Sequence, residues 1–246
     1  MVCNDAVMTG SQQPIVVLVH GAWHGAWCWS NLQAELDGRG IASLAVDLPG
    51  HGTSLEPFGD LHGDADHLTQ VLAKVHGPVV LVGHSYGGAV ISQAACDAPN
   101  VTHLVYLTAF VPDVGEGVLS LLNSMPPADT ALSAAMVIGE GGFSTINPDL
   151  AHGAFYGHSN PAATSAHVAR LCAQPFATFT QPLTSAAWHT IESTFVRCTE
   201  DGAIHISHQD LMASRCTNIE TLATDHSPFA SMPAQTADIV ERIVRA

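Results

Sequence analysis

Ser85 is the central residue of the pentapeptide Gly-His-Ser-Tyr-Gly, residues 83–87. A short apolar run, 78–82, precedes the pentapeptide, and a run suited to a helix, 88–95, follows it. Between a strand and a helix, Gly-x-Ser-x-Gly forms a nucleophile elbow, a strained turn that places the serine hydroxyl at the N-terminus of the helix. We therefore expect Ser85 to be a catalytic nucleophile. The alternative is a glycine-rich turn in which the serine only caps the helix.

A serine hydroxyl is a weak nucleophile that needs an imidazole base, and a carboxylate must hold that imidazole in one tautomer. Of the fifteen histidines, His226 is selected because it lies between the last expected strand and the last expected helix. Asp201 follows the preceding expected strand. Because ligands bind where the carboxyl ends of parallel strands meet, both side chains are candidates for a triad with Ser85.

Three other carboxylates compete for the role of the acid. Asp113 follows an earlier expected strand and is the main alternative to Asp201. Glu200 adjoins Asp201 and is expected to point elsewhere, whereas Asp225 adjoins His226 and is expected to order the loop.

Apolar runs and helical patterns alternate along most of the chain. This alternation predicts an α/β fold with a doubly wound, mostly parallel sheet. Continuous apolar runs are typical of strands that are buried on both faces of such a sheet. The expected strands are 15–19, 42–46, 78–82, 101–107, 193–198 and 217–222. The expected helices follow the first strand to about residue 36 and then cover 60–75, 88–98, 205–214 and 232–244.

The alternation stops between about residues 112 and 189, where prolines and glycines are frequent. Helices are expected near 118–122 and 162–172, and no strand is expected in this stretch. A segment this long is not a simple loop. We expect residues 113–189 to form an inserted, mainly helical cap, and residues 1–112 and 190–246 to form the core.

With these elements in place, the sequence resembles the α/β-hydrolase superfamily. It is most similar to the branch that contains plant methyl esterases, hydroxynitrile lyases and their bacterial esterase relatives. Weaker similarity in 107–112 and in the cap, from 155 to 175, extends the resemblance over nearly the whole chain. The segments that carry the resemblance are 19–27, 82–88, 198–204 and 225–229.

The resemblance implies the triad Ser85, Asp201 and His226, and it favours Asp201 over Asp113 as the acid. An oxyanion hole needs two N–H donors. The residue after the nucleophile supplies one, Tyr86. By resemblance, the other comes from the residue after the His-Gly pair 20–21, which is Ala22.

Four aromatic side chains are candidates for substrate contacts. Trp23 is next to the expected oxyanion hole, and the other three are large side chains in the part of the cap that resembles the family. Packing within the protein is the alternative for each of them. The four candidates are Trp23, Phe155, Tyr156 and Phe176.

Length and composition limit the function further. A chain of 246 residues that is 47% hydrophobic is long enough for one large domain. A formal net charge of −15 disfavours binding to nucleic acid or to anionic membranes. Residues 1–13 lack the features of a signal peptide, and no apolar run approaches 18 residues, so we expect no membrane segment. Six cysteines without a C-x-x-C pair predict buried free thiols and a cytoplasmic protein.

We expect neither a cofactor nor a metal. The pairs His20/His24 and His205/His208 lack a clear third ligand. Gly-x-Gly-x-x-Gly and Walker A motifs are both absent from the sequence.

The leading hypothesis is a serine hydrolase that cleaves a small or medium-sized hydrophobic carboxylic ester through an acyl-enzyme on Ser85. An amide or carbamate hydrolase would use the same residues. A hydroxynitrile-lyase-like enzyme is disfavoured, because such relatives carry a lysine just after the catalytic histidine, where this chain has Ser227 and Pro228. A receptor that binds a small ligand without turnover is a further alternative. The expected partner is a small-molecule substrate. The oligomeric state stays open, with a homodimer as one alternative.

Overall fold

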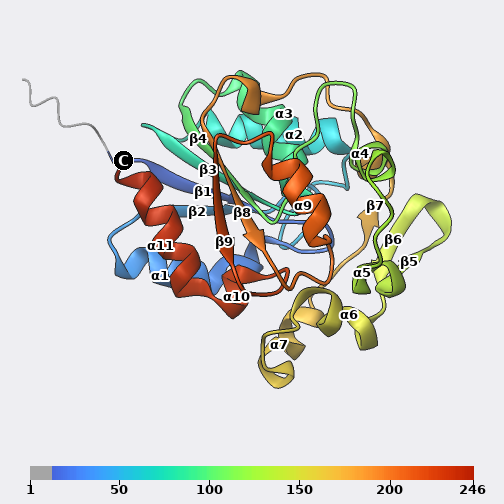
Figure 1. Ribbon diagram of the computed structural model, residues 1–246. Coiled ribbons are helices and arrows are strands. Elements are labelled where there is room, and N and C mark those ends of the chain that lie inside the picture. Colours follow the sequence, from blue (N-terminus) through green and yellow to red (C-terminus); the bar gives the residue numbers. More distant parts are fainter. Residues whose placement is uncertain (1–12) are drawn as a thin grey trace, which may run out of the picture.

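The computed structural model describes residues 13–246, and its centre is a six-stranded sheet in which all paired strands are parallel. The strand order is β2-β1-β3-β4-β8-β9, which places β3 and β4 in the middle (Figure 1). The predicted α/β fold is thereby confirmed. The strands are β1 (Ile15–Val19), β2 (Ser43–Val46), β3 (Val79–His84), β4 (Val101–Leu107), β8 (Ser193–Cys198) and β9 (Asn218–Leu222).

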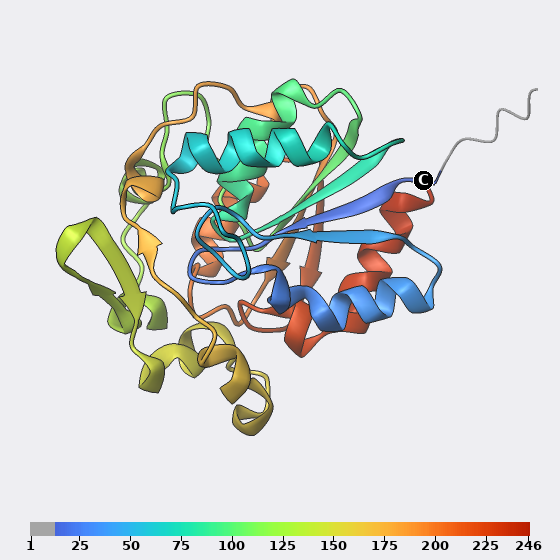
Figure 2. The same ribbon diagram turned by 180° about the vertical axis from the view of Figure 1, so that it is seen from behind.

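Helices cover both faces of this sheet (Figures 1 and 2). In β1, Val17 and Val19 face a core shared with one set of helices, and Val16 and Leu18 face the core on the other side. This division follows from the two-residue period of a strand, and it explains why the central strands are apolar throughout. The first set comprises α2 (Leu61–Leu72), α3 (Gly87–Ala94) and α9 (Ile206–Ala213), and the second comprises α1 (Ser30–Gly38), α10 (Pro228–Ser231) and α11 (Pro233–Val244).

Residues 113–189 lie beside the carboxyl ends of the strands, in green to orange in Figure 1. The expectation that this stretch contains no strand was wrong, because three short strands form an antiparallel sheet in the order β5-β6-β7. Strands of two to four residues are too short to show an alternating pattern. The elements are α4 (Val118–Ser124), α5 (Ala131–Ala135), β5 (Met136–Ile138), β6 (Phe143–Ile146), α6 (Pro148–Phe155), α7 (Pro161–Val168), β7 (Gln174–Pro175) and α8 (Ala177–Thr180).

Short 3-10 helices complete the chain. They extend or connect the longer elements, as η2 does by continuing α3 toward the expected helix end near residue 98. They are η1 (Ala26–Trp29), η2 (Ala95–Asp97), η3 (Glu140–Gly142) and η4 (Ala187–His189).

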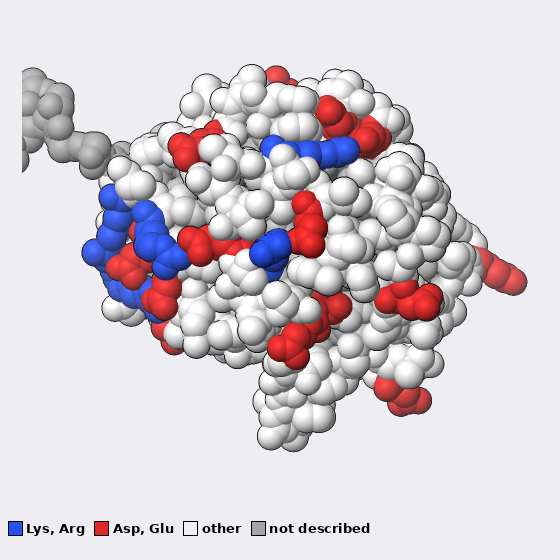
Figure 3. All heavy atoms as spheres, in the orientation of Figure 1, with Lys and Arg blue, Asp and Glu red and all other residues white. Residues whose placement is uncertain are grey.

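The surface is sparsely charged, and the basic side chains visible in Figure 3 stand beside acidic ones. At the end of the molecule that holds α11, for example, Arg39 forms ion pairs with Asp238 and Glu241. None of the helices in residues 13–246 combines the length and the apolar character needed to cross a membrane.

The thiols differ in part from the expectation. All five cysteines within residues 13–246 are free, but only Cys28 and Cys198 are buried, and Cys96 is exposed. Cys96 lies in η2, beside the buried Ala95, and a cysteine count does not reveal which side of a helix a thiol occupies. Cys3 and most of the stretch considered for a signal peptide lie outside the described residues.

Candidate active site

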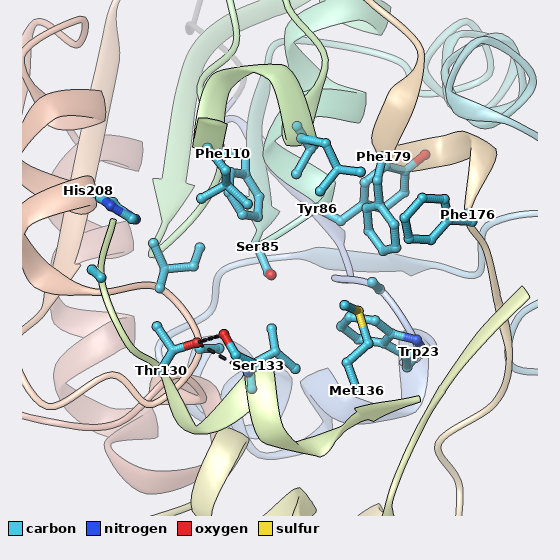
Figure 4. A pocket seen from close by; sticks show the side chains of 18 of the residues that line it. Trp23, Ser85, Tyr86, Phe110, Thr130, Ser133, Met136, Phe176, Phe179 and His208 are labelled. Carbon is cyan, nitrogen blue, oxygen red and sulfur yellow. Dashed lines mark hydrogen bonds between the residues drawn. The ribbon is translucent and has the colours of Figure 1, made fainter. Parts of the chain in front are cut away.

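Ser85 occupies the sharp turn between β3 and α3, with a φ of 53°. This left-handed conformation is strained for a residue with a side chain. The flanking glycines are required by close contacts. A Cβ on Gly83 would lie 2.6 Å from the carbonyl oxygen of Gly87, and one on Gly87 would lie 2.7 Å from that of His20. The turn therefore forms only with this sequence pattern, and it directs the Ser85 hydroxyl into a cavity (Figure 4).

His226 and Asp201 meet in the interior, each from a loop that follows a strand. The His226 Nδ1–H donates to Asp201 Oδ2 at 2.7 Å, and both side chains are almost completely buried. The other oxygen of Asp201, Oδ1, accepts from the N–H groups of Ala203 at 2.6 Å and Ile204 at 2.8 Å. These bonds fix the carboxylate so that Oδ2 faces the imidazole. The neutral imidazole then keeps its lone pair on Nε2, as a general base requires.

Thr108 is a member of this network that the sequence analysis missed. Its hydroxyl donates to Asp201 Oδ2, the oxygen that faces His226. Thr108 directly follows β4 and has a φ of 39°, an uncommon value for a threonine. Thr108 could have been recognised as a candidate from the sequence, because it follows the expected strand next to the one that leads into the elbow.

The competing carboxylates have other partners. Asp113 is bound to His189 Nε2 at 2.7 Å, and this bond lowers the pKa of Asp113. Glu200 is bound to His158 at 2.8 Å. Asp225 orders its own loop, as expected, by accepting from the N–H of Ser227 at 3.0 Å.

His84 connects the elbow turn to the loop that carries His226. Its Nε2–H donates to the carbonyl oxygen of His226 at 2.8 Å, and the two imidazole rings are 4.5 Å apart. Burial holds the pKa of His84 well below its usual value, so this imidazole is neutral. No hydrogen bond within residues 13–246 involves Ser85 Oγ or connects it to His226. The structure thus joins His226 to Asp201 and leaves Ser85 facing the cavity.

Two backbone N–H groups beside Ser85 are available to a ligand. Within residues 13–246, no hydrogen bond uses the N–H of Ala22 or of Tyr86, and both residues line the cavity. The loop of Ala22 is packed against Ser85, since a Cβ on Gly21 would lie 2.8 Å from the Cβ of Ser85. This pair of donors matches the requirement of an oxyanion hole.

Neutral histidines hold that loop in place. His24 Nδ1–H donates to the carbonyl oxygen of Ala22 at 2.8 Å, and His24 Nε2 accepts from the Tyr156 hydroxyl at 2.9 Å. His20 Nε2 accepts from the N–H of Leu48 at 3.1 Å. Burial lowers the pKa of His20 and of His24 to about 3. Across residues 13–246, there is no group of three or more His, Cys, Asp or Glu side chains that could hold a metal ion.

The cavity above Ser85 has a volume of about 290 Å³ and a mainly apolar wall (Figure 4). Trp23 and Phe176 line it, as the sequence analysis expected. Phe110 and Phe179 also line it and were missed, as were the residues Thr130, Ser133 and His208, which give one side of the cavity some polarity. The missed residues come from separate segments of the chain, so no local motif identifies them.

The other two aromatic candidates lie behind this wall. Phe155 packs against Trp23 and His226, with ring centroids 6.0 and 5.8 Å away. Tyr156 supports His24, as described above. Both side chains are buried and neither lines the cavity. The expectation of substrate contact is therefore corrected to a packing position for Phe155 and a supporting position for Tyr156.

The sequence and the fold are similar to those of known proteins. A family model described as "Alpha/beta hydrolase family" matches residues 16–239. The carbendazim hydrolyzing esterase of a Nocardioides species is 40% identical over 121 residues, which are 47% of this chain and 50% of that enzyme. The match thus spans half the length of that relative. Methylesterase 1 of Arabidopsis thaliana is 29% identical over 250 residues, which cover 92% of this chain and 94% of that protein.

Solved structures show the same fold. The crystal structure of the methylesterase MES16 from Arabidopsis matches with a TM-score of 0.77 and 26% sequence identity. The match covers 94% of this chain and 99% of that one. The similarity therefore includes most of residues 113–189.

Proposed function

This chain belongs to the alpha/beta hydrolase family, and from that premise we propose that it is a serine esterase acting on small or medium-sized hydrophobic carboxylic esters. One observation carries the proposal. The imidazole of His226, paired with the buried Asp201, lies 4.5 Å from the ring of His84, the residue before the elbow serine. That serine opens into an apolar cavity, and the nearby N–H groups of Ala22 and Tyr86 have no partner within residues 13–246.

The geometry supports the following reaction. Ser85 Oγ attacks the ester carbonyl while His226 Nε2 accepts its proton, and Asp201 stabilises the imidazolium that forms. The N–H groups of Ala22 and Tyr86 donate to the oxyanion, which also benefits from the N-terminus of α3. His226 then returns the proton to the departing alcohol. Water hydrolyses the acyl-enzyme through the same base.

The cavity supports the proposed substrate class. A volume of about 290 Å³ is at the lower end of the range for small-molecule sites, and apolar side chains dominate its wall. Relatives described as a carbendazim hydrolyzing esterase and as methylesterases favour an ester as well. We propose that residues 113–189 act as a cap that sets substrate preference, because they supply Phe176, Phe179 and Met136 to the cavity.

A panel of chromogenic esters that vary in acyl and alcohol size tests the proposal, with Ser85→Ala as the control. We expect the purified protein to release product from small apolar esters and the variant to release almost none. A fluorophosphonate should label the wild type once, at Ser85. The proposal would be wrong if the wild type turned over no ester and resisted the fluorophosphonate, or if Ser85→Ala retained more than about a thousandth of the activity.

A further inference from the structure

We propose that Gln174 of β7 is a positioning residue for the oxyanion hole, because it holds Trp23 in the conformation that places the neighbouring Ala22 N–H beside Ser85. This inference rests on the proposed esterase function. It makes residues 113–189 part of the catalytic machinery and gives them a role beyond covering the substrate.

Trp23 needs such support because of its backbone. Its φ of 62° lies in the left-handed region, which is disfavoured for any residue with a side chain. Unusual backbone conformations of this kind persist only when surrounding contacts impose them. Trp23 directly follows Ala22, so a change in the φ of Trp23 would rotate the Ala22–Trp23 peptide. Through the Ala22 backbone, this rotation would shift the Gly21–Ala22 peptide, which carries the Ala22 N–H.

Three residues from 144–174 bind all the hydrogen-bonding groups of Trp23. Its N–H donates to Gln174 Oε1 at 3.2 Å, and its carbonyl oxygen accepts from the N–H of Cys172 at 2.9 Å. Its indole Nε1–H donates to Ser144 Oγ at 3.2 Å. Ser144 in turn donates to the carbonyl oxygen of Gln174 at 3.3 Å. Gln174 therefore supports both the backbone and the side chain of Trp23.

The orientation of the Gln174 amide is determined by its partners. Thr178 uses its hydroxyl hydrogen to donate to the carbonyl oxygen of Pro175 at 2.6 Å, so Thr178 Oγ1 can only accept from Gln174, at 3.1 Å. The nitrogen of the amide thus faces Thr178, and its oxygen faces the Trp23 N–H. His51, from the loop after β2, also lies close to this oxygen, with Nε2 2.8 Å away.

Burial makes these bonds hard to replace. Gln174, Ser144 and Thr178 are completely buried, and Trp23 is 4% exposed. Without Gln174 Oε1, the N–H of Trp23 would be buried without a partner, which favours a change of backbone. An oxyanion donor acts mainly in the transition state, so its displacement lowers kcat more than it changes KM.

The test compares Gln174→Met with Gln181→Met. Gln181 is a matched control, because its side chain also connects residues 113–189 to the core, through the N–H of Leu61 and the carboxylate of Asp60, but it does not line the cavity. On a small activated ester, Gln174→Met should lower kcat about 10- to 100-fold with KM changed less than about threefold. Gln181→Met should leave both close to the wild type.

A trifluoromethyl ketone, which forms a tetrahedral oxyanion adduct with a nucleophilic serine, gives the second readout. Its Ki should rise in Gln174→Met by about the same factor as kcat falls. Thr178→Val, which frees the amide to turn, should show the same parallel change to a smaller extent. That variant decides the test if Gln174→Met does not fold. Thermal unfolding of each variant shows whether it is folded at the assay temperature.

The possible results separate the two proposals. If the wild type hydrolyses esters while a folded Gln174→Met keeps the wild-type kcat and ketone Ki, this inference is overturned and the esterase function stands. The same holds if Gln174→Met does not fold and Thr178→Val changes neither value. A wild type that neither hydrolyses an ester nor binds the ketone overturns both.

Discussion

The hydroxyl of Tyr86 donates a hydrogen bond of 2.7 Å to Asp64 Oδ2, and both residues are buried beneath the active site. Tyr86 follows Ser85, the proposed nucleophile, and its backbone N–H is one of the two proposed oxyanion donors. Asp64 belongs to α2, so this contact anchors the elbow to a helix on the face of the sheet. Burial raises the pKa of Asp64 to about 7, and within residues 13–246 its Oδ1 has no hydrogen-bond partner.

The raised pKa predicts how stability depends on pH. Between its unfolded pKa, about 4, and about 7, Asp64 binds more protons in the folded state than in the unfolded state. The stability that protonated Asp64 adds to the folded state is therefore fully present at low pH. It is lost as the pH rises through 7. Asp64→Asn is neutral at every pH and can still accept from Tyr86. Relative to this variant, the wild type should lose up to about 4 kcal/mol of unfolding free energy between pH 4 and 8.

Urea unfolding of both proteins at several pH values measures this difference. Asp60→Asn, on the same helix, is the control, because hydrogen bonds from Gly63 and Gln181 lower the pKa of Asp60. Relative to Asp60→Asn, the wild type should lose unfolding free energy as the pH falls, which is the opposite of the trend expected for Asp64. Parallel pH profiles for the wild type and Asp64→Asn would contradict the prediction.

Asp201→Asn should reduce kcat by about 10³- to 10⁴-fold, because the amide favours the wrong tautomer of His226 and stabilises the imidazolium poorly. Asp113→Asn should change kcat less than about twofold, since Asp113 is bound to His189 on the surface. Steady-state kinetics on one small ester compare the two variants. A greater loss in Asp113→Asn would transfer the role of the acid to that residue.

Ser85→Ala and His226→Ala should each abolish nearly all turnover, and the double variant should be little worse than either. Residues that act as one unit have effects that are far from additive. The measurement is kcat for the two single variants and the double variant on an activated ester. Losses that multiply in the double variant would show that His226 is not the base for Ser85.

Phe176→Ala and Phe155→Ala should have different effects. Phe176 lines the cavity and is partly exposed, so its truncation should change the ratio of rates on large and small esters by about 10- to 200-fold. Phe155 is buried at 1% exposure, so its truncation should cost about 3–5 kcal/mol of stability and lower all rates alike. Melting temperatures and the ester panel separate the two effects. If Phe155→Ala alone changed the ratio, the assignment of the cavity wall would be wrong.

The sequence by itself determined the fold, and it predicted which strand ends carry the candidate triad. Continuous apolar runs such as 15–19 and 101–107 predicted buried parallel strands, because a strand covered on both faces carries no alternating pattern. The order of Ser85, Asp201 and His226 along these strands predicted that they meet at one edge of the sheet. Local rules were sufficient here, since each residue is placed by the strand that precedes it.

Only the tertiary structure decided how the site is supported and lined. Thr108, Asp64 and Gln174 contact their partners across 93, 22 and 151 positions of the sequence. The tertiary structure also placed Phe155 and Tyr156 behind the cavity wall, whereas Phe179 is part of that wall. Such contacts depend on how the segment 113–189 packs onto the core, and its short strands and helices carry too little periodicity to predict that packing. Side-chain contacts between distant segments follow from the shape of the whole protein, whereas a strand or an elbow turn follows from its own residues.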